Sequence, residues 1–300
     1  ALALCLGLGG CAGQEQGESG FAPEERERLV IYTSHKAEVW RPIVREFEER
    51  TGIWVTVETG GSNELLERIH REEDAPRADV MFGGGVEGLA AYADCFTPYT
   101  ARDADKLDAR FSRADGLWTP FSTLPVVLIY NNKLLSAARV TGWHDLLSPA
   151  FRGHIAFADP EISGSCFTSL VTMAAALGGD WQEDVRAFAE NLDGRQLDSS
   201  GAVLTAVADG SALVGITLEE TALQHIAAGE DIALVYPSDG TSCVPDGSAL
   251  VKGAPHGDNA RLFLDFTVST DVQSMVGQRF CRRTVRADIP ADPSLPPLST

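Results

Sequence analysis

The feature that most constrains the fold is a regular alternation of short apolar runs with longer amphipathic segments between residues 29 and 85. Residues 29–33, 53–59 and 78–84 are short and rich in β-branched or aromatic residues, which is typical of strands. Between them, apolar residues recur at intervals of three and four, which is typical of helices. This order of strands and helices predicts a parallel sheet wound by right-handed crossovers.

Polar or small residues follow each of the three predicted strands. They are Ser34-His35-Lys36, Gly60-Gly61-Ser62 and Gly83-Gly84-Gly85. Ligands of parallel α/β sheets bind beyond the carboxyl ends of the strands. We therefore expect these three loops to contribute to one ligand site.

A second α/β unit is predicted from residue 125. The β-branched run 125–132 carries the chain out of the first unit, and residues 153–177 give strand, loop and helix, with Ser163-Gly164-Ser165 at the helix start. The run 232–253 is expected to return the chain, so the helix predicted at 260–269 belongs to the first unit. The sequence thus predicts two α/β lobes joined by crossing strands.

These patterns divide the chain into six parts. In chain order they are a signal-peptide remnant with a lipobox at 1–11, a polar tether at 12–27, the first part of lobe 1 at 28–124, lobe 2 at 125–245, the return to lobe 1 at 246–290 and a Pro-rich tail at 291–300.

Composition excludes some classes of partner. The chain has 300 residues and a formal net charge of −19, which argues against nucleic acid, because such binding requires Lys and Arg to neutralise phosphates. A small anionic ligand remains compatible, since charges farther away than about 8 Å are largely screened. The sequence contains no GxSxG, HExxH or P-loop motif, so it gives no sign of an enzyme.

The first residues indicate export. Residues 1–10 are apolar but only about half as long as a membrane span. Leu8-Gly9-Gly10-Cys11 resembles a lipobox, which predicts lipidation of Cys11, and an ordinary secretory signal is the alternative. Either case places the protein outside the cytoplasm, lipid-anchored at the cell membrane or periplasmic.

The remaining cysteines show no framework spacing. Cys95, Cys166, Cys243 and Cys281 are even in number, so disulfides are possible, but no CxxC or Cys/His cluster suggests zinc. Four ordinary thiols are the favoured interpretation.

Four stretches, residues 31–69, 78–89, 143–165 and 248–266, resemble the extracellular solute-binding proteins of ABC importers, in particular the iron(III) and phosphorylated-solute branch. The similarity covers about residues 28–290. It implies an α/β, two-lobed periplasmic-binding-protein fold of type II. In that fold each lobe is a mainly parallel sheet flanked by helices, and the ligand cleft lies between the lobes. It also implies delivery of the ligand to a membrane permease and its ATPase.

The resemblance departs from the ferric pattern. Ferric binders of this branch use a His in the loop after the first strand, a Glu after the third strand and two adjacent tyrosines in the second lobe. His35 matches the first position, whereas Gly84 stands at the second and Glu219-Glu220 replace the tyrosines. Fe(III) accepts carboxylates as a hard cation, so His35, Glu219 and Glu220 form the alternative metal site.

The residues expected to bind an anion match the family better than the expected metal ligands do. Ser163-Gly164-Ser165 corresponds to the loop with which the family holds phosphate, and a Gly-containing turn at a helix start aims N–H groups and hydroxyls at an anion. The predicted ligand-binding residues are Ser34, His35, Lys36, Gly61, Ser62, Asn63, Gly84, Gly85, Ser163, Gly164, Ser165, Thr217, Glu219 and Glu220.

Several candidates also have a purely structural explanation. Ser62 and Ser163 are typical N-cap residues, Gly83 to Gly85 can form a tight turn, and His35 is compatible with a structural role. Adjacent carboxylates on a helix usually include one that is solvated and one that caps.

The late basic residues have two interpretations as well. Arg282, Arg283 and Arg286 are expected to form a solvated patch, with an anion anchor as the alternative.

Together these features predict the substrate-binding component of an ABC importer. We expect a monomer without a cofactor that binds a small phosphorylated or phosphonate organic solute. The loop Ser163-Gly164-Ser165 would hold the phosphate, and hydroxyls or an amine of the solute would face Glu219 and Glu220. Ferric iron is the alternative cargo. A sensory binding protein or an enzyme on the same fold is the alternative class.

Overall fold

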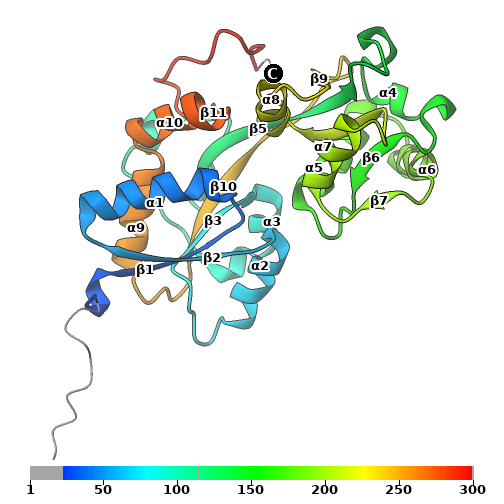
Figure 1. Ribbon diagram of the computed structural model, residues 1–300. Coiled ribbons are helices and arrows are strands. Elements are labelled where there is room, and N and C mark those ends of the chain that lie inside the picture. The colour runs from blue at the N-terminus through cyan, green and yellow to red at the C-terminus, as the bar shows by residue number, and fades with distance from the viewer. Residues whose placement is uncertain (1–22, 114, 299–300) are drawn as a thin grey trace, which may run out of the picture.

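The computed structural model describes residues 23–113 and 115–298 and shows two lobes, each built around its own hydrophobic core (Figure 1). Residues 1–22 are outside this range, so the predicted signal peptide, the lipobox with Cys11 and most of the tether lie outside the described residues. No helix within the described ranges is long and apolar enough to cross a membrane.

The first lobe begins with the predicted parallel sheet. Strand β1 (Arg28–Thr33) lies between β2 (Trp54–Thr59) and β3 (Val80–Gly85) and runs parallel to both. The crossovers are α1 (Ala37–Thr51) and α2 (Ser62–Arg71), and α3 (Val86–Ala91) follows β3. Helix α1 ends at Gly52, whose φ of 71° is left-handed and favours glycine.

The second lobe combines parallel and antiparallel pairs. Its strands are β6 (Ile155–Ala158), β7 (Gln196–Leu197), β8 (Val214–Leu218) and β9 (Ile232–Val235). Its helices are α4 (Trp143–Leu146), α5 (Gly164–Leu177), α6 (Trp181–Leu192), α7 (Ser200–Ala208) and α8 (Glu219–Ala227). Strand β6 pairs in parallel with β7 and β8, as predicted for a crossover-built sheet.

Two long strands connect the lobes. In β5 (Thr119–Asn131), residues 119–125 pair with β10 (Cys243–Val251), whereas residues 126–130 pair with β8. Both pairings are antiparallel. Strand β5 passes directly from one lobe to the other without a crossover helix. The exchange of partners coincides with the lobe boundary predicted at residue 125, and the exact division of the chain into lobes stays a prediction.

The chain returns to the first lobe after β10. Helices α9 (Gly257–Thr267) and α10 (Thr270–Phe280) lie beside α1 (Figure 1). Phe263 and Val276 of these helices enter the same core as Phe47 of α1. The short strand β11 (Arg283–Thr284) then pairs with β5 near the exchange point. This places the helix predicted at 260–269 in the first lobe.

The four cysteines of the described chain are free thiols. Cys95 and Cys166 are buried, while Cys243 and Cys281 are partly buried. Burial raises the pKa of the Cys166 thiol, so it stays protonated as an ordinary core group.

His256 fixes the start of α9 to the first lobe. Its Nδ1 lies 2.8 Å from Asp79 Oδ2, its Nε2 lies 3.0 Å from Glu25 Oε1, and its backbone N–H donates to Asp79 Oδ1. Burial lowers the pKa of His256, but the two carboxylates outweigh burial and raise that pKa above its usual value of 6.5.

We predict that His256→Gln destabilises the protein more in acid than in alkali. A raised folded-state pKa stabilises the fold below the unfolded value near 6.5, and this stabilisation is lost as pH rises through the folded value. The loss should be about 1 to 2 kcal/mol at pH 6 and smaller at pH 9, measured by urea unfolding. His225→Gln, which removes a more exposed pair with Glu230, is the control. A loss independent of pH would contradict the assignment.

Candidate functional site

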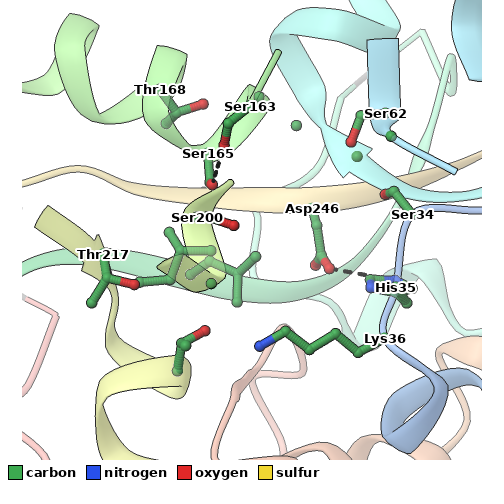
Figure 2. Close-up of a pocket in the computed structure, with 18 of the residues that line it drawn as sticks. Ser34, His35, Lys36, Ser62, Ser163, Ser165, Thr168, Ser200, Thr217 and Asp246 are labelled. Atoms are coloured by element: carbon green, nitrogen blue, oxygen red, sulfur yellow. Dashed lines mark hydrogen bonds and ion pairs between the residues drawn. The ribbon is translucent and has the colours of Figure 1, made fainter. Parts of the chain in front are cut away.

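A cavity of about 320 Å³ lies between the two lobes (Figure 2). Its walls come from the loops after β1 and β3, from the starts of α2, α5, α7 and α8, and from the crossing strands β5 and β10. The residues that were predicted for the site and that line the cavity are Ser34, His35, Lys36, Gly61, Ser62, Gly84, Gly85, Ser163, Gly164, Ser165, Thr217 and Glu220.

The lobes touch at this cavity. A Cβ placed on Gly164 of lobe 2 would lie 3.9 Å from Ser62 Oγ of lobe 1, and one placed on Gly85 would lie 3.7 Å from Thr168 Oγ1. The lobes therefore approach each other here, and both contribute to one site.

Three helix N-termini meet at the cavity from both lobes. Helix α2 begins at Ser62, α5 begins at Gly164 after its N-cap Ser163, and α7 begins at Ser200. Figure 2 shows the side chains of these regions on opposite sides of the same space. Because the first backbone N–H groups of a helix have no intrahelical partner, such an arrangement offers several donors to an anion.

Ser163 has both of the roles considered for it. Its Oγ accepts a hydrogen bond from the backbone N–H of Cys166 at 3.4 Å, so it is a true N-cap. The same Oγ lies 3.1 Å from Ser165 Oγ, and both residues line the cavity. Ser62, in contrast, is the first residue of α2, and Gly61 occupies the N-cap position.

Lys36 brings an exposed positive charge to the site. Its side chain is exposed and extends across the cavity in Figure 2. Among the residues that the structure describes, it forms no ion pair. An anion in the cavity would thus meet a lysine whose charge is not already neutralised.

Buried charges form the floor of the cavity. Arg282 Nη1 donates to Asp246 Oδ2 at 2.8 Å, and Arg282 Nη2 lies 3.4 Å from Glu220 Oε1. Ser122 donates to Asp246 Oδ1 through its backbone N–H and its hydroxyl. His35 Nδ1 lies 3.4 Å from Arg282 Nη1.

His35 is neutral in this environment. Burial and the Arg282 charge lower the pKa of His35 well below its usual value. Because a guanidinium can only donate, Nδ1 of His35 must accept and its proton sits on Nε2. The imidazole packs against both Phe82 and Phe121, with ring centroids 4.5 and 5.1 Å away.

Gly83 makes room for this histidine. Its φ is +91°, and a Cβ at this position would lie 2.7 Å from His35 Nε2. Gly84, with φ of +113°, lines the cavity as predicted. The tight-turn explanation was wrong, because Gly83 to Gly85 are the last residues of β3; Gly83 leaves room for His35, and Gly84 faces the site.

Two predicted site residues do not line the cavity. Asn63 is exposed one position into α2. The Glu219 carboxylate is buried away from the cavity, where it accepts hydrogen bonds from Arg283 and from Tyr236 at 2.6 Å. Successive helix residues point about 100° apart, so only Glu220 of the pair can face the site.

The alternative metal set is therefore not assembled. Within the described ranges, no three His, Cys, Asp or Glu side chains lie together as a metal site. Glu219, one of the three expected ligands, contacts Arg283 instead.

The expected solvated basic patch was wrong as well. Arg282 is only 6% exposed and belongs to the cavity floor, and Arg286 is 5% exposed and pairs with Asp103 and Asp288. Each of these arginines finds a carboxylate partner, which is the usual condition for burying a guanidinium.

The sequence also left some lining residues unpredicted. Of these, Thr168, Ser199, Ser200 and Asp246 are the polar ones that matter most for ligand chemistry, and Arg282 was considered only as an alternative anion anchor. Ser199-Ser200-Gly201 repeats the serine and glycine pattern of Ser163-Gly164-Ser165 at a helix start, so it had a signal of its own. Asp246 and Arg282 had no such local signal.

A cavity between two α/β lobes, lined by helix N-termini from both, is typical of a protein that binds a small solute between its lobes. The chain belongs to the bacterial extracellular solute-binding protein family, whose profile matches residues 75–294.

Relatives and solved structures agree with this assignment. The chain is 25% identical to iron uptake protein A1 of Synechocystis, over 96% of this chain and 84% of that protein. It is also 25% identical to a periplasmic protein of Salmonella typhimurium provisionally named for binding 2-aminoethylphosphonate, over 82% of this chain and 74% of that protein.

The solved periplasmic binding protein AfuA of Actinobacillus pleuropneumoniae, with fructose-6-phosphate bound, superposes with a TM-score of 0.80 at 24% identity, covering 89% of this chain and 87% of AfuA. This likeness shows that the fold is the type II periplasmic-binding-protein fold predicted from the sequence.

We predict that Ser163→Ala combined with Ser165→Ala weakens anion binding by about 2 to 4 kcal/mol, at about 1 to 2 kcal/mol per lost hydrogen bond to a charged group. Calorimetry with inorganic phosphate measures the effect. Ser269→Ala removes an N-cap hydroxyl on α10, outside the cavity lining, and should lower stability without changing affinity. Unchanged affinity in a folded double variant would remove this loop from the site.

Proposed function

We propose that this protein is the substrate-binding component of an ABC importer and that it captures a small phosphorylated or phosphonate organic solute. The observation that carries the proposal is the meeting of three helix N-termini, several serine hydroxyls and the unpaired Lys36 at one cavity. The solute would be delivered to a permease and its ATPase.

The energetics require such a convergence. One helix N-terminus stabilises an exposed anion by about 0.3 to 1 kcal/mol and up to about 2 kcal/mol when partly buried. Micromolar affinity takes about 8 kcal/mol. Helix starts from both lobes, acting together with Lys36 in an enclosed space, supply the number of interactions that this affinity needs.

Other lining residues suit a ligand with a second polar end. Thr217, Glu220 and Thr221 also line the cavity, and Glu220 Oε2 has no hydrogen-bond partner among the described residues. A carboxylate oxygen and two hydroxyls suit the hydroxyl groups or the amine of an organic solute. The volume of about 320 Å³ is at the lower limit for small-molecule pockets, which favours a small solute.

The names of the relatives fit this chemistry in part. One relative is named for 2-aminoethylphosphonate, and AfuA was solved with a sugar phosphate. Ferric iron is the second candidate, because another relative is an iron uptake protein. Its alternative ligand set is incomplete here, since Gly84 has no side chain and Glu219 pairs with Arg283.

The family also supports the class and location of the protein. Its family and fold are those of binding proteins, so we do not propose an enzyme. We propose an extracytoplasmic monomer, held at the membrane by a lipid on Cys11 or free in the periplasm.

Native mass spectrometry of the protein purified without added ligand tests this function. A bound mass that matches a small phosphorylated or phosphonate compound is expected. Calorimetry with phosphate, sugar phosphates and aminoalkylphosphonates should then show binding. No response to any of these compounds, together with tight binding of ferric citrate, would reject the proposal.

The two adjacent glutamates give a matched pair of variants. We predict that Glu220→Gln weakens binding of the organic solute by about 1.5 to 3 kcal/mol, because it weakens a hydrogen bond to a charged group. Inorganic phosphate lacks the second end and should bind as before. Glu219→Gln, whose carboxylate faces Arg283 and Tyr236, should leave both affinities unchanged. Equal losses in the two variants would contradict this placement.

A further inference from the structure

Three side chains of types that commonly ligate metal ions surround one guanidinium group at the floor of the cavity. Arg282 Nη1 lies 2.8 Å from Asp246 Oδ2 and 3.4 Å from His35 Nδ1, and Arg282 Nη2 lies 3.4 Å from Glu220 Oε1. All four residues line the cavity, and none is more than 7% exposed. The arrangement is a buried cation with an imidazole and two carboxylates turned toward it.

The protonation states of these groups also resemble those of a metal site. Arginine is always charged, so the central cation is permanent. Nδ1 of His35 is the acceptor nitrogen of a neutral imidazole, which is the form in which histidine binds metals. One imidazole and two carboxylates are a donor set that suits several transition metals.

Arg282 also keeps these donors from forming a metal site. One of its nitrogens contacts His35 and Asp246, while another contacts Glu220, so the donors are spread around the planar group. In the described part of the chain, no three such side chains are close enough to hold a metal ion together. A metal ion entering from the cavity would also meet the positive charge of the guanidinium.

We propose that Arg282 is the residue that keeps metal ions out of the site. Its guanidinium acts as a built-in cation at the centre of His35, Asp246 and Glu220, where a metal ion would otherwise be held, and the helix starts and Lys36 are left to bind an anion. This inference rests on the proposed function and deepens it, because it explains how a chain related to iron uptake proteins takes an organic anion instead.

His35 is also held by Asp246 within the same cluster. Its Nε2 lies 3.6 Å from Asp246 Oδ2, while its Nδ1 faces Arg282. Both ring nitrogens of His35 are therefore directed at partners inside the cluster, and neither is free for a metal ion while Arg282 is present.

Replacement of Arg282 tests the proposal directly. Arg282→Gln and Arg282→Ala remove the internal cation and leave two buried carboxylates and an imidazole without one. Both variants should gain affinity for Mn(II), measured by electron paramagnetic resonance, and for Fe(III) supplied as the citrate complex, by at least about tenfold over wild type. Phosphate affinity should fall in the same variants, because the two carboxylates of the floor are no longer balanced by a guanidinium and the floor becomes more negative.

Three control variants separate this effect from general damage. Arg283→Ala breaks the neighbouring ion pair with Glu219, which does not line the cavity, and should gain no metal affinity. Adding Asp246→Asn to Arg282→Gln removes one of the three donors and should abolish the gain. Arg282→Lys keeps a cation at the site and should behave like wild type toward metals.

The outcomes are distinct. A folded Arg282→Gln or Arg282→Ala protein without increased metal binding overturns the inference, and so does tight Fe(III) binding by the wild type, whether or not the variants fold. If the wild type binds phosphorylated solutes and the folded variants gain no metal affinity, this inference fails and the proposed function stands. If the wild type responds to no organic phosphate or phosphonate, the proposed function itself fails.

Discussion

Strand β5 belongs to both lobes, and the position of the site follows from this. Its residues pair with β10 up to Pro125 and with β8 from Val126 onward. Proline lacks a backbone N–H, so the hydrogen-bonded ladder is weakest where Pro125 and Pro245 lie at the change of partners. Leu124, Pro245 and Asp246 line the cavity at the same point, so the cavity lies next to the exchange of strand partners.

The segment after α10 adds a third link between the lobes. Helix α10 packs into the core of lobe 1, and the two arginines that follow it reach the first two residues of α8 in lobe 2. Arg282 pairs with Glu220 on the cavity side, and Arg283 pairs with Glu219 on the other side. Buried ion pairs add little net stability, but loss of one partner costs about 3 to 5 kcal/mol. Their main effect is therefore to specify how the lobes are joined.

Short sequence patterns predicted the strands, the helices and most of the loops that line the cavity. The alternation of apolar runs gave the parallel arrangement of β1, β2 and β3, and the serines and glycines at strand ends gave most of the cavity lining. Nothing local distinguishes Glu219 from Glu220. Successive helix residues point about 100° apart, and this rotation alone turns Glu219 toward Arg283 and Glu220 toward the cavity. The position of Arg282 depends on contacts with residues 36 and 247 positions away, so its sequence neighbourhood resembled a solvated patch.

An acidic protein can bind an anion if dipoles rather than net charge provide the attraction. The formal net charge is −19, and the cavity floor combines Arg282 with two carboxylates. The positive potential comes mainly from the helix starts at Ser62, Gly164 and Ser200 and from Lys36. Ser62 belongs to lobe 1 and the other two helix starts to lobe 2, so an anion is fully surrounded only when the lobes are closed. A ligand shifts a conformational equilibrium only through its different affinity for the two states. An anion that contacts both sets of helix starts must therefore stabilise the closed form, which couples capture of the solute to the shape change of the protein.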